Sequence, residues 1–188
     1  MTAESLKLDR SRAALLLVDL QEKLARAMDP EALERVERNV LALVEGAKAL
    51  GVPLLVTEQY PQGIGATLPA IRAALPEGVT PIEKVDFSCL LVPAVQAELE
   101  RLGRRQIVLA GMEAHICVFQ TARDLAAAGY QVFVPHDAVL SRVDENRRVG
   151  LELAQRAGAV TTATETVLFD LLGRAGTPEF KAVSRLIK

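Results

Sequence analysis

Short runs of apolar residues alternate along the whole chain with longer stretches in which apolar residues recur at helical spacing. An unbroken apolar run is typical of a strand covered on both faces of a sheet. Longer stretches with apolar residues three or four positions apart indicate helices with one buried face. Six strands are predicted, at residues 13–18, 54–57, 79–83, 106–110, 132–134 and 159–162. Helices are predicted at residues 30–50, 68–75, 92–102, 115–128 and 144–157, and over most of the C-terminal remainder.

Strands that alternate with helices favour a parallel sheet, because parallel neighbours require a crossover connection. The predicted fold class is therefore α/β, an open, doubly wound, six-stranded parallel sheet with helices on both faces, in a Rossmann-like three-layer arrangement. A length of 188 residues suits a single domain over residues 1–188. Asp29 and Gly51 carry the signals expected at the start and end of the first long helix.

Composition and charge argue against several classes of protein. Hydrophobic residues make up 50% of the chain and charged residues 24%, which is ordinary for a folded protein. The formal net charge is -2 with both signs interspersed, so no nucleic-acid partner is expected. The apolar run at residues 13–18 is too short to span a bilayer and lacks a convincing cleavage site, so neither membrane insertion nor secretion is expected. Two cysteines are too few for a disulfide framework, which is consistent with a reducing cytoplasm.

Three chemically useful side chains stand at or just beyond the ends of predicted strands. Asp19 follows the first strand and Lys84 follows the third, while Gly111 follows the fourth and leads into a helix that begins near Cys117. In an open parallel sheet the ligand crevice lies beyond the carboxyl ends of the strands. At the start of a helix, free backbone N–H groups are expected to lower the pKa of a thiol. A carboxylate, an ammonium and a cysteine in one crevice are the components of an activated nucleophile.

Each of the three residues also has an ordinary structural explanation. An aspartate after a strand is often a turn or helix cap. A lone lysine is usually a solvated surface residue, and a lone cysteine is usually a small buried apolar side chain. The functional interpretation depends on the three residues occurring together at strand ends.

The same segments resemble a known family, the isochorismatase-like cysteine hydrolases. The segments that carry the resemblance are Leu15-Leu16-Leu17-Val18-Asp19-Leu20-Gln21, Glu83-Lys84 with Phe87-Ser88, and Gly111-Met112-Glu113-Ala114-His115-Ile116-Cys117-Val118. The order Asp, Lys, Cys matches the catalytic triad of the family, and the resemblance spans essentially the whole chain. A narrower resemblance is to the isochorismatase domain-containing subgroup. It is carried by Thr57-Glu58-Gln59-Tyr60-Pro61 with Gly63 and Gly65, and by the tail from Pro178 to Lys188.

Two departures from better-known relatives narrow the expected activity. Nicotinamidases of this superfamily bind a metal through an Asp-x-His pair and a further histidine, whereas this chain has Glu58-Gln59-Tyr60 there and only two histidines, His115 and His136. Neither a metal nor any other cofactor is therefore expected. True isochorismatases lack the nucleophilic cysteine, so Cys117 disfavours vinyl-ether hydrolysis.

The resemblance implies hydrolysis of a C–N bond in a small amide- or carbamoyl-type substrate. Asp19 would act as base and Cys117 as nucleophile, with the charge of Lys84 stabilising both. Family members hold the peptide bond that corresponds to Met112–Glu113 in cis, and the backbone N–H groups of Glu113 and Cys117 would form the oxyanion hole. Family members are commonly dimers or tetramers, so a homo-oligomer is also expected.

Four neighbouring residues are candidates for lining the substrate pocket, namely Gln21, Tyr60, Phe87 and His115. Packing or turn structure explains each of them equally well, and His115 could instead cap a helix or form a pocket wall. His136 and Asp137 could be crevice residues or part of a plain turn. Cys89 is interpreted as structural, although a redox pair with Cys117 is conceivable.

Two other classes of protein compete with the hydrolase. The first is a protein of the same fold that retains the triad but mainly binds a partner or metabolite with little turnover. The second is a receiver-like phosphoacceptor domain, which also has an aspartate and a lysine at strand ends. That domain needs a further acidic pair for Mg²⁺ near the first strand, where this chain has only Asp19, so the second alternative is disfavoured.

Overall fold

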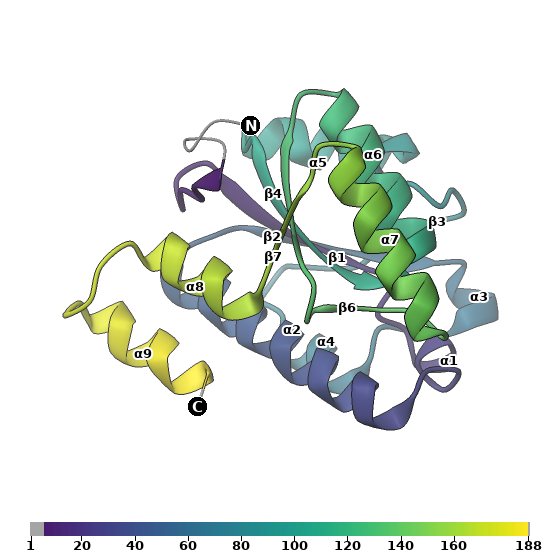
Figure 1. The fold of residues 1–188 in the computed structure, drawn as a ribbon, viewed down its shortest axis with the longest axis horizontal. Coiled ribbons are helices and arrows are strands. Elements are labelled where there is room, and N and C mark those ends of the chain that lie inside the picture. The colour runs from purple at the N-terminus through teal and green to yellow at the C-terminus, as the bar shows by residue number, and fades with distance from the viewer. Residues whose placement is uncertain (1–5, 188) are drawn as a thin grey trace.

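A parallel sheet with helices on both faces forms the centre of the molecule in the computed structural model, which describes residues 6–187 (Figure 1). The main path of the sheet has the strand order β3-β2-β1-β4-β5-β7, and β6 pairs with β4 beside that path. All of these ladders are parallel. The strands are β1 Ala13–Val18, β2 Leu54–Gln59, β3 Ile82–Lys84, β4 Gln106–Met112, β5 Gln131–Pro135, β6 Val139–Leu140 and β7 Val160–Thr162. The predicted fold class is confirmed.

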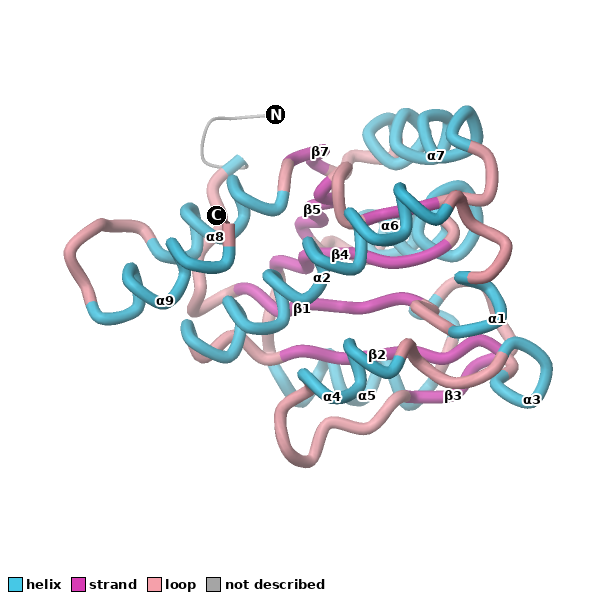
Figure 2. The backbone as a smooth tube through the Cα atoms, turned by 90° about the horizontal axis from the view of Figure 1, so that it is seen from below, coloured by secondary structure: helices cyan, strands magenta, loops and turns pink. Residues whose placement is uncertain are grey.

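Two sets of helices cover the two faces of the sheet: one set lies below the strands and the other above them in Figure 1, and the lower set passes in front of the strands in Figure 2, which is seen from below. One set packs with the apolar cluster that contains Leu15 and Leu17, and it comprises α2 Pro30–Leu50, α4 Pro69–Ala74, α8 Thr164–Leu172 and α9 Pro178–Leu186. The other packs with the cluster that contains Leu16 and Val18, and it comprises α5 Pro93–Leu102, α6 Phe119–Ala127 and α7 Asp144–Arg156. Successive side chains of a strand point to opposite faces, so an all-apolar β1 supplies both layers of core.

Short helical turns connect these elements near the carboxyl ends of the strands. They are α1 Glu22–Ala25, α3 Pro61–Ile64, the 3-10 turn η2 Cys89–Leu91 and the π-helical turn η3 Ala114–Val118. Helix α2 begins and ends as the sequence predicts. The Asp29 carboxylate accepts a hydrogen bond from the Ala32 N–H at 2.8 Å, and Gly51 ends the helix with a φ of 66°. Within residues 6–187, no helix combines the length and apolarity that crossing a bilayer would require.

The sheet differs from the prediction in its strand count and in several strand bounds, including β2 and β4, which end at Gln59 and Met112 rather than at residues 57 and 110. It has seven strands rather than six, because the two-residue strand β6 pairs with the end of β4. Strand β3 covers Ile82–Lys84 rather than residues 79–83, since Gly78 adopts a left-handed φ of 81° and Pro81 has no N–H to donate to a ladder. Lys84 is the last residue of β3 rather than the residue that follows it. Gly111 lies inside β4, because that strand continues to Met112.

Candidate active site

The carboxyl ends of β1, β2 and β3 bring Asp19 and Lys84 into direct contact. Asp19 follows β1 with a φ of 52°, and its N–H donates to the Thr57 carbonyl on β2 at 3.2 Å. The Lys84 ammonium lies 2.7 Å from the Asp19 Oδ2, and both side chains are almost fully buried. The Thr57 hydroxyl donates to the other carboxylate oxygen, Oδ1, at 2.8 Å. Both oxygens of the Asp19 carboxylate are thus held in place.

Three further oxygen atoms surround the Lys84 ammonium. It donates to the Gln59 Oε1 at 2.6 Å, to the Asp86 carbonyl at 3.1 Å and to the Phe87 carbonyl at 3.2 Å. Burial is the largest single influence and lowers the pKa of Lys84, but the Asp19 carboxylate and the neighbouring Cys89 and Cys117 together outweigh it, so the pKa lies above its usual value of 10.5. Lys84 is therefore a fixed positive charge at neutral pH.

The Cys117 thiol completes the cluster. It lies close enough to the Asp19 carboxylate for that charge to act on its pKa, and the residue is only 7% exposed. Burial raises the pKa of the Cys117 thiol, the Asp19 carboxylate raises it further, and the Lys84 ammonium offsets part of that effect. The expectation of a lowered thiol pKa is therefore wrong, because burial and a neighbouring carboxylate outweigh the start of the helix. The resting cluster is a neutral thiol beside a carboxylate–ammonium ion pair.

The backbone that leads from β4 to Cys117 contains a conformationally required glycine and a cis peptide bond. Gly111 has a φ of 138°, and a Cβ at this position would lie 2.0 Å from the Val18 carbonyl oxygen. Close packing of β4 against β1 therefore requires glycine here. The Met112–Glu113 peptide bond is cis, as the resemblance implies. The Glu113 N–H has no hydrogen-bond acceptor among residues 6–187, so it is free to donate to a ligand.

The helix predicted at residues 115–128 begins with a π-helical turn rather than with a regular α-helical turn. A π-helical turn, η3, carries Cys117 and then continues directly into α6 at Phe119. The Val118 N–H donates to the Glu113 carbonyl at 3.3 Å, five residues back, which is the hydrogen bond of a wider helical turn. Such single turns are frequent at functional sites.

The four candidate substrate-lining residues have different environments. Gln21 is fully buried, and its amide hydrogen-bonds with the N–H and carbonyl of Gln59 and with the Gly65 carbonyl. These contacts assign Gln21 to holding the loop after β2 rather than to lining a pocket. Tyr60 and Phe87 are 55% and 52% exposed, beside the backbone that holds Lys84. His115 is half-buried, with its Nδ1 3.0 Å from the Ser141 hydroxyl.

Cys89 lies behind the cluster. It is completely buried, and its Sγ lies 3.7 Å from the same Thr57 hydroxyl that donates to Asp19. Burial raises the pKa of the Cys89 thiol to about 11. Both cysteines are free thiols in this structure. Its complete burial makes Cys89 a structural neighbour of the site rather than a second nucleophile.

His136 and Asp137 are separate from the triad. They border a cavity of about 240 Å³ between α2 and the start of α7. The Asp137 carboxylate accepts hydrogen bonds from the N–H and hydroxyl of Thr164, at 2.8 and 2.9 Å, and so anchors the start of α8. Residues 6–187 contain no group of three histidine, cysteine or acidic side chains placed to hold a metal ion.

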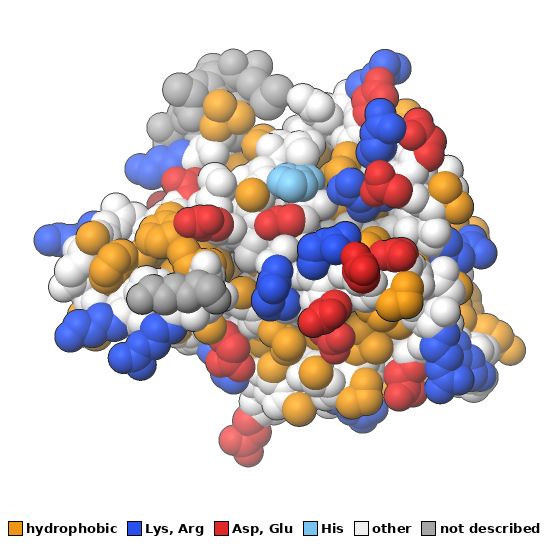
Figure 3. All heavy atoms as spheres, turned by 60° about the horizontal axis from the view of Figure 1, so that its bottom comes forward, with side chains coloured by type: hydrophobic (Ala, Val, Ile, Leu, Met, Phe, Trp, Pro, Cys, Tyr) orange, Lys and Arg blue, Asp and Glu red, His pale blue; other side chains and the backbone are white. Residues whose placement is uncertain are grey.

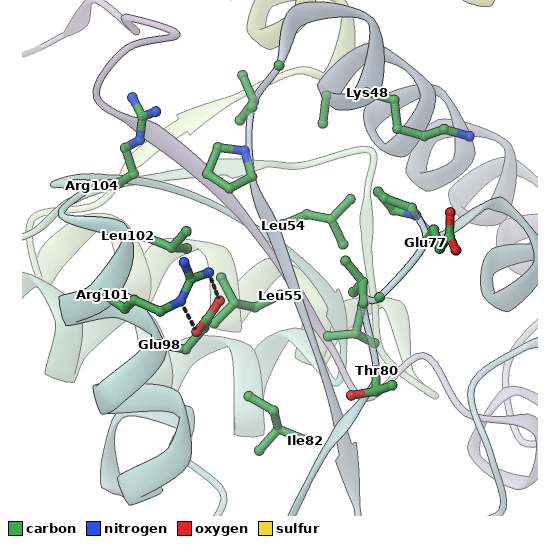
Figure 4. A pocket seen from close by; sticks show the side chains of 18 of the residues that line it. Lys48, Leu54, Leu55, Glu77, Thr80, Ile82, Glu98, Arg101, Leu102 and Arg104 are labelled. Atoms are coloured by element: carbon green, nitrogen blue, oxygen red, sulfur yellow. Dashed lines mark hydrogen bonds and ion pairs between the residues drawn. The ribbon is translucent and has the colours of Figure 1, made fainter.

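A larger cavity, of about 1040 Å³, opens beside the amino-terminal half of β2 (Figure 4). Leu54 and Leu55 form part of its wall, together with Thr80, Ile82 and the ion pair between Glu98 and Arg101. The triad instead contacts Thr57 and Gln59 at the opposite end of the same strand. The larger cavity is therefore not the candidate active site.

Several residues of the site were missed by the sequence analysis. Thr57 and Gln59 end the second strand at the same edge as Asp19, so the strand-end rule that selected Asp19 also points to them. Ser141 and Arg142 contact His115 and Glu113 from a segment almost thirty residues away. No local pattern in the sequence predicts these two contacts.

Comparisons with known proteins agree with this fold and arrangement. The isochorismatase domain family matches residues 13–166. A Bos taurus protein named isochorismatase domain-containing protein 2 is 38% identical over 175 residues, which are 93% of this chain and 82% of that protein. The MAR1 ribonuclease from Caenorhabditis elegans superposes with a TM-score of 0.90 at 34% identity, covering 96% of this chain and 92% of that one. The YcaC gene product from Escherichia coli, described as an octameric hydrolase of unknown specificity, superposes with a TM-score of 0.88 at 24% identity, covering 97% and 89%.

The doubly wound parallel sheet with a buried aspartate, lysine and cysteine at its carboxyl edge defines a class of α/β protein with the fold of isochorismatase-like hydrolases. The chain belongs to the isochorismatase family, and the similarity to isochorismatase domain-containing protein 2 supports the narrower subgroup.

Proposed function

We propose that this protein is a cysteine hydrolase that cleaves a C–N bond in a small amide- or carbamoyl-type substrate through a thioester intermediate. The observation that carries the proposal is the buried contact between the Asp19 carboxylate, the Lys84 ammonium and the Cys117 thiol. A neutral thiol beside a fixed carboxylate is a nucleophile with a candidate general base next to it.

In the first half of the reaction, the Asp19 carboxylate takes the thiol proton as the Cys117 Sγ forms a bond to the substrate carbonyl carbon. The carbonyl electron pair moves onto oxygen and gives a tetrahedral oxyanion. The N–H groups of Glu113 and Cys117 donate to that oxyanion, and such donors contribute strongly because they are oriented before the reaction. The C–N bond then breaks, and the proton held by Asp19 passes to the leaving nitrogen.

In the second half, water attacks the thioester carbonyl while Asp19 again accepts a proton. The C–S bond breaks, the acid product leaves, and the Cys117 thiol regains its proton. Lys84 remains charged throughout, because its raised pKa prevents it from releasing a proton at neutral pH. Its role is to hold the Asp19 carboxylate in place and to stabilise negative charge near the sulfur.

Intact-mass analysis against a panel of amides, ureas and carbamoyl compounds tests the proposal. We expect at least one compound to leave an acyl adduct on Cys117 and none on Cys89, which is completely buried. Binding of compounds without any adduct or turnover across the panel would favour the alternative of a triad-bearing binding protein. Acylation only at a residue other than Cys117 would contradict the mechanism.

A short RNA belongs in the same panel, because one similar structure is named a ribonuclease. That activity is stated for the Caenorhabditis elegans protein. The present chain has 22 basic and 24 acidic side chains, and the face in Figure 3 shows the two signs interspersed rather than in a basic stripe. Nucleic-acid affinity depends on clustered positive charge, so we expect no RNA cleavage. RNA cleavage that requires Cys117 would replace the amide proposal.

We also propose that the chain self-associates as a dimer or tetramer. Large apolar side chains are exposed at Tyr60, after β2, and at Val85, Phe87 and Leu91, after β3, and exposed apolar surface often marks an interface. Sedimentation equilibrium should give a mass of at least two chains at micromolar concentration. Val85→Glu should shift the chain toward monomer, because Val85 is 72% exposed and would bring a charge into the contact. A monomeric wild-type protein would contradict this expectation.

A further inference from the structure

The Glu113 side chain is tied to a residue far away in the sequence. Its carboxylate accepts a hydrogen bond from the Arg142 backbone N–H at 2.9 Å, and the Arg142 Nε lies 3.2 and 3.1 Å from its two oxygens. Glu113 is 5% exposed, whereas the Arg142 side chain is 55% exposed. The buried member of this ion pair is therefore Glu113, whose own backbone N–H is free to donate at the candidate oxyanion hole.

Three more contacts join the same region of the fold. The Ser141 hydroxyl lies 3.0 Å from the His115 Nδ1. Helix α7 packs on the backbone of η3 at Gly150, where a Cβ would lie 2.5 Å from the Ala114 carbonyl carbon. Strand β6 also pairs with β4 at Gly111 and Met112, directly before the nucleophile segment. The segment from β6 into α7 thus contacts residues 111–115.

We propose that Arg142 is a positioning residue that holds the Glu113 N–H in the orientation required for oxyanion binding. The inference rests on the proposed function, because an oxyanion hole matters only if Cys117 attacks a carbonyl. Arg142 contacts the Glu113 carboxylate and acts through it, so it need not touch the substrate.

Small displacements at such a site have large effects on rate. Oxyanion donors act at a defined hydrogen-bonding distance, and a displacement of about 1 Å can slow a reaction on the order of a hundredfold. Removing the Arg142 guanidinium leaves the hydrogen bond from its own backbone N–H to Glu113. We therefore expect a partial loss of positioning, about tenfold in rate, rather than complete loss of activity.

The experiment compares two reactions of the same thiol. p-Nitrophenyl acetate acylates a thiol through a tetrahedral oxyanion, whereas iodoacetamide alkylates it by direct displacement with no oxyanion on a carbonyl. For Arg142→Gln we expect acylation of Cys117 to slow about tenfold, with the alkylation rate and the thermal midpoint nearly unchanged. Glu113→Gln should slow acylation similarly, and the double variant should be no slower than the worse single variant.

Arg148→Gln is the matched control, because Arg148 is an exposed α7 arginine whose side chain, among residues 6–187, pairs only with the exposed Glu145. It should change neither rate. Normal acylation by Arg142→Gln would overturn the inference while leaving the proposed function intact. An equal loss of acylation and alkylation would show a merely structural role and would also overturn it. If the wild-type Cys117 is alkylated but never acylated, the proposed function fails, and this inference fails with it.

Discussion

Replacing Cys117 by alanine should lower hydrolysis to the uncatalysed background, a loss of at least about ten-thousandfold in kcat. The thioester route has no other sulfur available to it, because the Cys89 thiol is completely buried and its pKa is raised to about 11. The fold should survive, since the substitution removes one atom from a site at the crevice edge. The measurement is kcat with a substrate identified from the amide panel, together with the thermal unfolding midpoint.

Cys89→Ala is the matched control for that variant. This substitution also removes one buried sulfur. The Cys89 Sγ lies 3.7 Å from the Thr57 hydroxyl, which is a long contact. Its kcat should stay within a few fold of the wild-type value. Turnover by Cys117→Ala above background would remove the nucleophile assignment, and a loss of turnover in Cys89→Ala instead would transfer that assignment to the other cysteine.

The placement of Asp19 and Lys84 at one edge of the sheet could be predicted because both residues obey rules that depend on local sequence. An unbroken apolar run ends immediately before Asp19, and the strand-end rule then places the carboxylate at the crevice. Lys84 follows from the same rule, even though the predicted third strand begins three residues too early. The distance between the two charged groups, 2.7 Å, depends on the register of three parallel strands, and no sequence pattern specifies it.

Other parts of the site depend on long-range contacts and could not be predicted. Strand β6 has two residues, which is too short for any periodicity, yet it pairs with β4 and precedes Arg142. The raised pKa of Cys117 also depends on tertiary structure, because burial and the carboxylate of Asp19 cause it. Sequence reasoning considered only the start of the helix and therefore gave the wrong direction of the shift.

Asp19→Asn should abolish acyl-enzyme formation and destabilise the fold. The amide oxygen of asparagine is a poor base, so the buried thiol would lose its proton acceptor. Lys84 would remain as a buried ammonium without a countercharge, which typically costs about 3–5 kcal/mol of folding free energy. In the wild type, the raised pKa of Lys84 means that the stabilisation from this pair is fully present at neutral pH. On the alkaline side, it is lost as the pH rises above 10.5 and through the raised pKa of Lys84.

A double variant separates the two effects of Asp19. Asp19→Asn combined with Lys84→Met removes both charges, so the free energy of unfolding, measured in urea, should recover part of the loss seen with Asp19→Asn alone. Acylation of Cys117 should not recover, because the base is still absent. If acylation returned together with stability, Asp19 would act on the fold rather than on the proton. A normal thioester burst from Asp19→Asn alone would exclude Asp19 as the base, and the Cys117 thiol would then need another proton acceptor.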